Sequence, residues 1–316
     1  MRDLRPVPIR LIGRVARRAL ACGSDWRVLA VFRRSVYCES GAGALVCLGP
    51  PSLGAGPLNA LADLPERLDW EGSGLRPGAP ALCDGTTVRV DGRLWLSLAG
   101  AREWRPPPPS AWDPDRLAWG VATLADEARA RRAPGLCGLI PALAGGRGAD
   151  DLLSRAAWRP ISALTTWVGA ALADPGHEAA PPAEVARLLG LGPGLTPSGD
   201  DALGGAMVAL HGLGRPDVAR RLAEQVLPQA RERTTVISVA HLAAAADGEG
   251  AAALHATLAA LGGARRRALG PCLDALAALG HSSGWDALAG AAAVLGASVR
   301  ARVARAAAAR EAPTWS

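Results

Sequence analysis

One loop-like stretch constrains the fold of this chain more than any other: Gly192-Pro193-Gly194-Leu195-Thr196-Pro197-Ser198-Gly199-Asp200-Asp201. Its three glycines and two prolines within eight residues exclude a continuous helix and a central strand. An apolar run from Ala202 to Leu210 follows directly and has the pattern of a helix. We therefore expect a shaped loop that opens a helix, with Ser198 as the N-cap and Asp201 at capping-box spacing.

A glycine-rich loop at a helix start exposes backbone N–H groups that can bind an anion. The pattern is not a Walker loop, because it lacks Gly-Lys-Ser/Thr, and it does not follow a βαβ strand as a dinucleotide-binding loop would. We take as candidate substrate- or phosphate-binding residues of this loop Gly194, Thr196, Ser198 and Gly199.

A second stretch repeats the end of the first. The nine residues Ser283-Gly-Trp-Asp-Ala-Leu-Ala-Gly-Ala291 match Ser198-Gly-Asp-Asp-Ala-Leu-Gly-Gly-Ala206 at all but two positions. Two interpretations stay open. In one, two helix starts face each other and hold a ligand, with Ser282 and Ser283 among the binding residues. In the other, two capped helices pack closely at Gly205 and Gly290.

Composition indicates a globular chain. The 316 residues are 49% hydrophobic and 20% charged, enough for one large domain or two ordinary ones. No run of about 18 uncharged apolar residues is present, and no signal-peptide core follows the N-terminus. We therefore expect a cytoplasmic protein without a membrane partner. The six cysteines form no Cys-x-x-Cys pair, which argues against a zinc ribbon and a redox motif.

The net charge of +6 comes from arginine alone, since the chain has no lysine. A pI near 9.5 would permit nucleic-acid binding. However, the arginines are spread along the chain and do not alternate with aromatic residues. We therefore expect no nucleic-acid partner.

The pattern changes near residue 106, which predicts an α+β protein of two domains. Residues 1–105 are β-rich, with a strand at Trp26 to Phe32 and a hairpin whose turn is Asp91-Gly92. Residues 106–112 are a proline-rich linker. Residues 113–312 have helical spacing throughout, so we expect an all-α domain that carries the glycine-rich motif.

Two further places offer polar side chains. Asn59 is the chain's single asparagine, and its amide either binds a ligand or caps a turn at Ala60. If the segment that begins at Arg233 is helical, Thr234, Ser238 and His241 share one face. Such a stripe suits a polar ligand, but it also occurs as an ordinary hydrogen-bonded contact between helices.

Three phrases together resemble the AllH-type family of oxamate carbamoyltransferase subunits. They are the run from Gly192 to Asp201, Thr234-Thr-x-Ile-Ser238, and Gly280-His-Ser-Ser-Gly-x-Asp286. Gly56-Pro-Leu-Asn59 also fits, so the resemblance covers most of residues 5 to 300. One departure is Ala202, where relatives tend to carry a bulky aromatic residue after the aspartate pair.

The resemblance implies a role in anaerobic allantoin breakdown within purine catabolism. The implied reaction is phosphorolysis of oxalurate to oxamate and carbamoyl phosphate, and the activity needs other subunits. The family supplies no agreed set of catalytic residues. A non-catalytic subunit that completes or regulates another protein's active site is the alternative function.

The residues of this chain fit carbamoyl transfer to phosphate. That chemistry needs a positioned anion and stabilised charge on a tetrahedral intermediate. We take His281, Asp200 and Asp201 as candidate catalytic residues, with His281 donating to the oxyanion or moving a proton. The aspartates repel a bare phosphate, so one of them is expected to orient His281 or an arginine. Binding of Mg²⁺ is the lower-ranked alternative, and otherwise no cofactor is expected.

Overall fold

The structure is a computed structural model that describes residues 6–22, 24–66, 69–108, 112–147, 151–174, 176–263 and 268–311. The chain divides into two compact units, Met1–Pro106 and Pro107–Ser316. Residues 109–111 of the predicted linker and residue 312 at the predicted end of the helical domain lie outside the described residues. The fold class is α+β, as predicted, with a barrel-like sheet in residues 7–104 followed by a mostly helical region.

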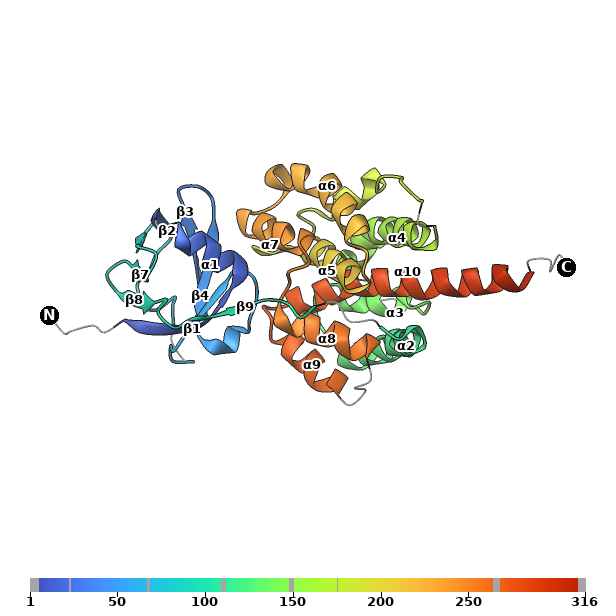
Figure 1. Ribbon diagram of the computed structural model, residues 1–316, viewed down its shortest axis with the longest axis horizontal. Coiled ribbons are helices and arrows are strands. Elements are labelled where there is room, and N and C mark those ends of the chain that lie inside the picture. The colour runs from blue at the N-terminus through green and yellow to red at the C-terminus, as the bar shows by residue number, and fades with distance from the viewer. Residues whose placement is uncertain are drawn as a thin grey trace. The chain divides into compact units, whose positions relative to one another are not determined.

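The first unit is a single sheet that closes on itself (Figure 1). Its strands run in the spatial order β5-β4-β3-β2-β6-β7-β8-β1-β9, and β5 also pairs with β1. The strands are β1 (Val7–Gly13), β2 (Ser24–Val31), β3 (Val36–Ser40), β4 (Leu45–Gly49), β5 (Asn59–Ala62), β6 (Pro80–Cys83), β7 (Thr87–Val90), β8 (Leu94–Ser97) and β9 (Arg102–Trp104). Helix α1 (Arg14–Ala21) follows β1, and a short 3-10 helix, η1 (Pro51–Leu53), follows β4.

Alternating burial forms the core of this sheet. Along β3 and β7 every second side chain is buried, which is the pattern of a sheet with one face inward. The predicted Asp-Gly hairpin is confirmed: Asp91 and Gly92 have φ angles of 50° and 62°, as a type I′ turn requires. The hairpin joins β7 to β8 in antiparallel register.

The second unit is helical, and its described residues contain no strand. Its longer helices are α2 (Pro114–Arg131), α4 (Leu152–Ala173), α5 (Ser198–Gly212), α6 (Pro216–Arg233), α7 (Val236–Ala246), α8 (Ala252–Gly262), α9 (Leu269–Ala277) and α10 (Ser283–Glu311). The shorter helices are η2 (Gly135–Leu139), α3 (Ile140–Leu143) and η3 (Ala183–Leu188). Asp113 caps α2, with its carboxylate accepting from the backbone N–H groups of Asp115 and Arg116.

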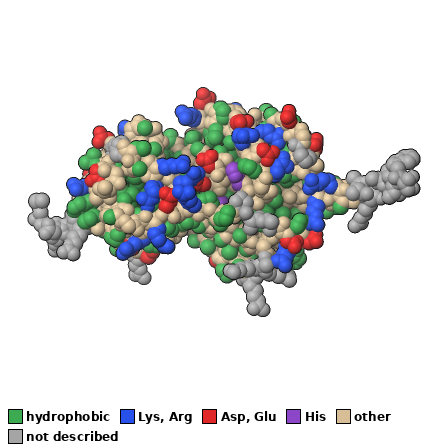
Figure 2. All heavy atoms as spheres, viewed as in Figure 1, with side chains coloured by type: hydrophobic (Ala, Val, Ile, Leu, Met, Phe, Trp, Pro, Cys, Tyr) green, Lys and Arg blue, Asp and Glu red, His purple; other side chains and the backbone are tan. Residues whose placement is uncertain are grey.

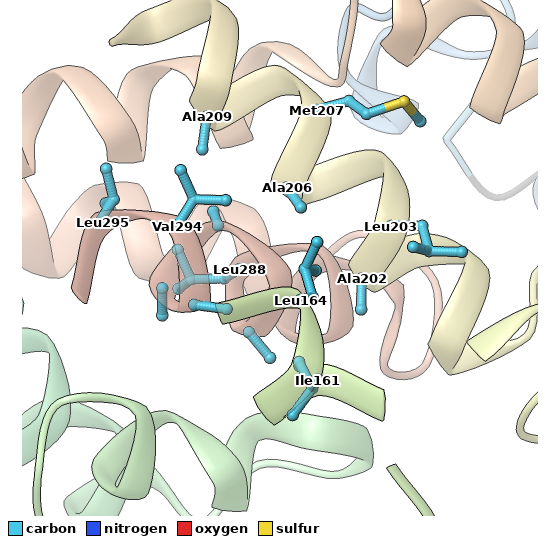
Figure 3. Close-up of a cluster of buried hydrophobic side chains, with 14 of the residues drawn as sticks. Ile161, Leu164, Ala202, Leu203, Ala206, Met207, Ala209, Leu288, Val294 and Leu295 are labelled. Atoms are coloured by element: carbon cyan, nitrogen blue, oxygen red, sulfur yellow. The ribbon is translucent and has the colours of Figure 1, made fainter. Parts of the chain in front are cut away.

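Helices α4, α5 and α10 form the centre of this unit. Side chains of all three helices are fully buried in one cluster (Figure 3), among them Ile161 and Leu164 of α4, Ala202 and Ala206 of α5, and Leu288 of α10. Many of the surrounding positions are alanine or glycine, so the helix axes approach closely. This close packing fixes where α5 and α10 begin.

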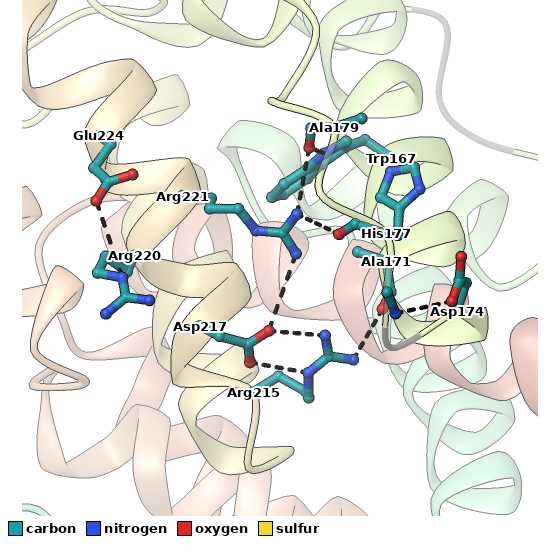
Figure 4. A network of polar contacts seen from close by, with 11 residues as sticks. Trp167, Ala171, Asp174, His177, Ala179, Arg215, Asp217, Arg220, Arg221 and Glu224 are labelled. Carbon is teal, nitrogen blue, oxygen red and sulfur yellow. Dashed lines mark hydrogen bonds and ion pairs between the residues drawn. The ribbon is translucent and has the colours of Figure 1, made fainter.

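A second contact ties α6 to α4 (Figure 4). The Arg221 guanidinium lies 5.6 Å from the centre of the Trp167 ring. Its Nη1 donates to the carbonyl oxygen of His177 at 2.6 Å. Arg215 pairs with Asp217 and donates to the carbonyl oxygen of Ala171 at 2.9 Å. These contacts hold the loop after α4 against α6.

Helix α10 is long and apolar enough over Ser283–Ala307 to cross a membrane by length and composition, although charged residues interrupt it. Most of that stretch is buried inside the structure, which is equally typical of the core helix of a soluble protein. Residues 302–307 of α10 are exposed, and Figure 1 shows this end of the helix extending beyond the other helices of the unit. Basic and acidic side chains are interspersed over the visible face of the molecule (Figure 2).

Candidate functional site

The starts of α5 and α10 meet in the second unit. The hydroxyl oxygens Thr196 Oγ1 and Ser283 Oγ lie 3.0 Å apart, although 87 positions separate them in the sequence. The start of α7 reaches the same loop, because Thr235 Oγ1 donates to the carbonyl oxygen of Leu195 at 2.5 Å. The three phrases singled out in the sequence therefore lie together.

The loop before α5 is shaped by glycine, as predicted, but its helix start differs from the prediction. Gly192 and Gly194 have φ angles of 111° and 93°, which glycine adopts without strain. The N-cap is Pro197 rather than Ser198, and no side chain caps the helix. Ser198 is instead the first helical residue and is buried.

The backbone N–H groups at the start of α5 are already engaged. Gly199 N donates to the carbonyl oxygen of Leu191 at 2.8 Å, and the amides of Asp200 and Asp201 donate to Pro197. The expectation of a free N–H group is therefore wrong for Gly199. Any ligand of Gly199 would have to bind without its N–H, whereas Gly194 lies in the exposed part of the loop.

Asp200 is a buried structural anchor. Its Oδ1 accepts from the backbone N–H of Gly190 at 2.9 Å, and its Oδ2 accepts a short hydrogen bond from the hydroxyl of Thr234. Burial raises the pKa of this carboxyl, and the hydrogen bonds from Thr234, Gly190 and Ser238 partly offset that rise. Because both oxygens are occupied, Asp200 fixes the loop to the segment between α6 and α7.

Asp201 and Asp286 are less well satisfied. Burial raises the pKa of the Asp201 carboxyl well above 3.8, and the negative charges of Asp286 and Asp200 raise it further. Asp286 is fully buried and its pKa is also raised, mainly by burial, while its Oδ1 accepts from Leu136 N at 2.6 Å. The Oδ2 atoms of both residues are buried without a hydrogen-bond partner among the described residues.

The two helix starts are equivalent in structure as well as in sequence. The hydroxyl of Ser283 acts on Asp201, and the hydroxyl of Ser198 acts on Asp286, in each case lowering the pKa of the carboxyl. The backbone repeats too. Leu191 N donates to Leu188 O and Leu279 N donates to Leu276 O, each at 3.0 Å. The likeness begins before the predicted repeat, with Leu-x-x-Leu-Gly in both copies.

Helix α7 contributes differently from the prediction. Thr234 lies before the helix in an extended conformation, as the C-cap of α6, so it does not share a helical face with Ser238 and His241. Thr235 is the N-cap, and its Oγ1 accepts from Ser238 N at 3.1 Å. Ser238 is buried, and its hydroxyl makes a long contact of 3.5 Å with Leu195 O. Thr234 and Ser238 thus support the loop around Asp200 from two sides.

The two histidines named in the sequence analysis, His241 and His281, differ in their environments. Burial lowers the pKa of His241 to about 4, so its imidazole is neutral near pH 7. His281 is exposed in the turn before α10, where its charge lowers the pKa of Asp286. Of the two, His281 is accessible to a ligand from solvent, and it lies beside Ser282, which is half-buried.

Asn59 belongs to the first unit, where it opens β5. Its amide Nδ2 donates to the carbonyl oxygen of Gly54 at 2.8 Å. The amide thus closes the turn that leads into the strand, whereas the expected turn at Ala60 is not formed, because Ala60 lies within β5. The part of Asn59 in ligand binding stays a prediction.

Sequence reasoning missed three participants. Asp286 was not among the candidate residues, although the repeat aligns it with Asp201. Leu136 N, which donates to Asp286, comes from a distant turn that no motif marks. Thr235, rather than Thr234, caps α7. The described residues hold no group of three or more His, Cys, Asp or Glu side chains arranged to bind a metal.

Comparison with known proteins gives one family and no fold relative. No solved structure matches the chain significantly. A family model matches one segment of the chain, which covers about a third of its length. This segment begins at the last residue of η3 and includes both helix starts and α7. The predicted resemblance is confirmed over this segment: residues 188–295 match the family model described as oxamate carbamoyltransferase subunit AllH.

Proposed function

We propose that this chain is a subunit of an oxamate carbamoyltransferase-like enzyme that cleaves oxalurate with phosphate to give oxamate and carbamoyl phosphate. The family match by itself implies the subunit. The observation that supports a site on this chain is the contact between Thr196 and Ser283, because it joins two motif loops inside the matched segment.

The reaction sets requirements that the loops can meet. A phosphate oxygen attacks the terminal carbamoyl carbon, the carbon–nitrogen bond to the oxamate nitrogen breaks, and that nitrogen takes up a proton. Negative charge develops on the carbamoyl oxygen in between. In this proposal the exposed His281 donates to that oxygen or supplies the proton to the leaving nitrogen. The hydroxyls of Thr196 and Ser283 orient the substrate.

The acidic residues shape the site rather than attack the substrate. Their negative charges would repel phosphate. In this proposal the carboxyls are therefore neutralised, or they orient His281 without contacting phosphate. Burial raises the pKa of Asp201 and of Asp286, so each carboxyl is stabilised when its charge is neutralised by a proton or by a cation. A neutral carboxyl beside His281 positions the imidazole without opposing the anion.

One observation favours the alternative, a partner subunit that completes another protein's active site. The N–H groups of Gly199, Asp200 and Asp201 are all engaged with backbone carbonyls, so α5 offers few free donors to an anion. In addition, Leu195 at the tip of the loop is 41% exposed. An apolar side chain at that place is suited to contact with another protein.

Calorimetry separates the two functions. The purified chain is titrated with phosphate, carbamoyl phosphate, oxamate and oxalurate, each with and without Mg²⁺. Saturable binding that is lost in His281→Ala, with an unchanged melting temperature, supports a site on this chain. Absence of binding to all four compounds contradicts that site and favours the partner-subunit function.

A further inference from the structure

Asp201 and Asp286 occupy equivalent positions in the two repeated helix starts, each three residues after the equivalent serines Ser198 and Ser283. In each carboxyl the Oδ2 atom is buried and lacks a hydrogen-bond partner among the described residues. Asp286 is 0% exposed. Two unsatisfied acceptors therefore lie at matching places in one buried cluster.

Such an arrangement is costly without a further positive group. Buried carboxylates in proteins are paired with a cation, are protonated, or bind a metal. The two charges act on each other unfavourably, and Asp200 adds a third negative charge. His281 lies near enough to Asp286 to lower the pKa of that carboxyl, but the His281 side chain is exposed to solvent. The cluster therefore has more buried negative charge than positive charge.

The side-chain atoms around the two carboxyls that could bind a cation are oxygen atoms. The hydroxyls of Ser198, Ser283 and Thr196 lie at the same helix starts, and Thr196 Oγ1 is 3.0 Å from Ser283 Oγ. Carboxylate and hydroxyl oxygens are the ligands that hard divalent cations prefer, and Mg²⁺ is commonly held by only one or two carboxylates together with water and substrate oxygens. A site with two carboxylates therefore suits Mg²⁺ when an anion completes the coordination.

We propose that a divalent cation of the Mg²⁺ type binds between Asp201 and Asp286, with the hydroxyls of Ser198 and Ser283 as further oxygen ligands. The cation neutralises the buried carboxylates and presents positive charge to an anionic substrate at the helix starts. Binding of the cation is independent of the reaction proposed above, whereas its contact with phosphate rests on that proposed function.

The test uses the full chain and Mn²⁺ as the probe, because free Mn²⁺ has a paramagnetic resonance signal that disappears on binding. We expect one bound Mn²⁺ per chain, displaced by Mg²⁺. Binding weakens by at least about tenfold in Asp201→Asn and in Asp286→Asn. Glu224→Gln is the matched control, since it removes one negative charge from a side chain that is 67% exposed, and it leaves binding unchanged.

Melting temperature gives an independent measurement. At a hundredfold excess over the wild-type Kd, Mg²⁺ raises the melting temperature of the wild type by about 5 to 10 °C and raises that of Asp286→Asn by at most about half as much. Asparagine retains an oxygen that accepts from Leu136 N, so this variant is expected to fold. If it does not fold, Ser283→Ala, which removes one hydroxyl ligand, must weaken Mn²⁺ binding instead.

Two outcomes overturn the proposal. In the first, Mn²⁺ does not bind, and the melting temperature rises on acidification but not with Mg²⁺, so a shared proton satisfies the pair. In the second, Mn²⁺ binds with equal affinity to Asp201→Asn, Asp286→Asn and the wild type. If the wild-type assembly binds Mn²⁺ but does not transfer a carbamoyl group, the proposed reaction is rejected and the cation site is retained.

Discussion

Gly205 of α5 packs against α10, and Gly290 of α10 packs against α5 in the same way. A Cβ atom added at Gly205 would lie 1.8 Å from the carbonyl oxygen of Ala287, and one added at Gly290 would lie 1.7 Å from that of Ala202. The two glycines are equivalent in the sequence repeat, and so are the two alanines. This relationship gives the helix pair an approximate two-fold symmetry, which places Ser198 near Asp286 and Ser283 near Asp201.

Gly205→Ala should be strongly destabilising. The added methyl group cannot fit without separating α5 from α10, so we expect the free energy of unfolding to fall by about 3 kcal/mol. The control is Gly204→Ala, whose added Cβ would lie 3.7 Å from Ala245 Cβ. Its better helix propensity should leave stability equal or up to about 1 kcal/mol higher. Urea denaturation measures both, and equal losses in the two variants would contradict this packing.

Arg221→Ala should destabilise the contact between α4 and α6. The side chain is 20% exposed, stacks on Trp167 and donates to backbone carbonyls, so its loss should cost about 1 to 3 kcal/mol. The neighbouring Arg220 is 72% exposed and its contact with Glu224 is 3.9 Å long. Arg220→Ala should change stability by less than about 0.5 kcal/mol in the same urea titration. A larger loss in Arg220→Ala than in Arg221→Ala would contradict the network in Figure 4.

The pKa of Asp201 predicts a pH dependence of stability. Because this pKa is raised above 3.8 in the folded chain, the folded state holds a proton that the unfolded state has released. The contribution of Asp201 to stability should therefore increase as the pH falls from neutral towards about 4. Asp201→Asn lacks this contribution, so the wild type should gain stability relative to the variant on acidification.

The comparison has to be made as a difference between the two proteins. His241 and His255 have pKa values lowered to about 4, so they reduce the stability of both proteins as the pH falls below 6.5. Urea denaturation of both proteins in EDTA, at several pH values between 4 and 7, isolates the contribution of the Asp201 carboxyl to the free energy of unfolding. A difference in unfolding free energy that stays constant over this range would show that Asp201 is ionised in the folded state.

His281→Ala should affect catalysis and not folding. The side chain is exposed, so the melting temperature should stay within about one degree of the wild type. If His281 moves a proton or donates to the oxyanion, the rate of carbamoyl transfer by the assembled enzyme should fall by about 10²- to 10⁴-fold. An unchanged rate in the assembled enzyme would exclude His281 from the reaction.

Local patterns predicted much of this fold. The Asp-Gly hairpin and the change from strands to helices depend on short-range preferences that the sequence displays directly. The repeat of Ser-Gly-x-Asp-Ala-Leu likewise indicated the paired helix starts, and the close-packing interpretation matches the contacts of Gly205 and Gly290.

The remaining details depend on long-range contacts. Ser198 has the residue type of an N-cap, but Pro197 takes that place, and Ser198 becomes a buried neighbour of Asp286. The N–H of Gly199 was expected to be free, but the preceding turn folds back and supplies the carbonyl of Leu191. Leu136 reaches Asp286 across 150 positions. Sequence spacing carries no information about such partners.

The most direct test of the account is the phosphorolysis of oxalurate by the native assembly that contains this chain. Assemblies with the wild type and with Asp201→Asn are purified in parallel, their subunit composition is matched, and carbamoyl phosphate formation is measured. We expect carbamoyl phosphate from the wild-type assembly and a rate lower by at least about 10²-fold from the variant. Equal rates from the two assemblies, or no carbamoyl phosphate from either, would contradict it.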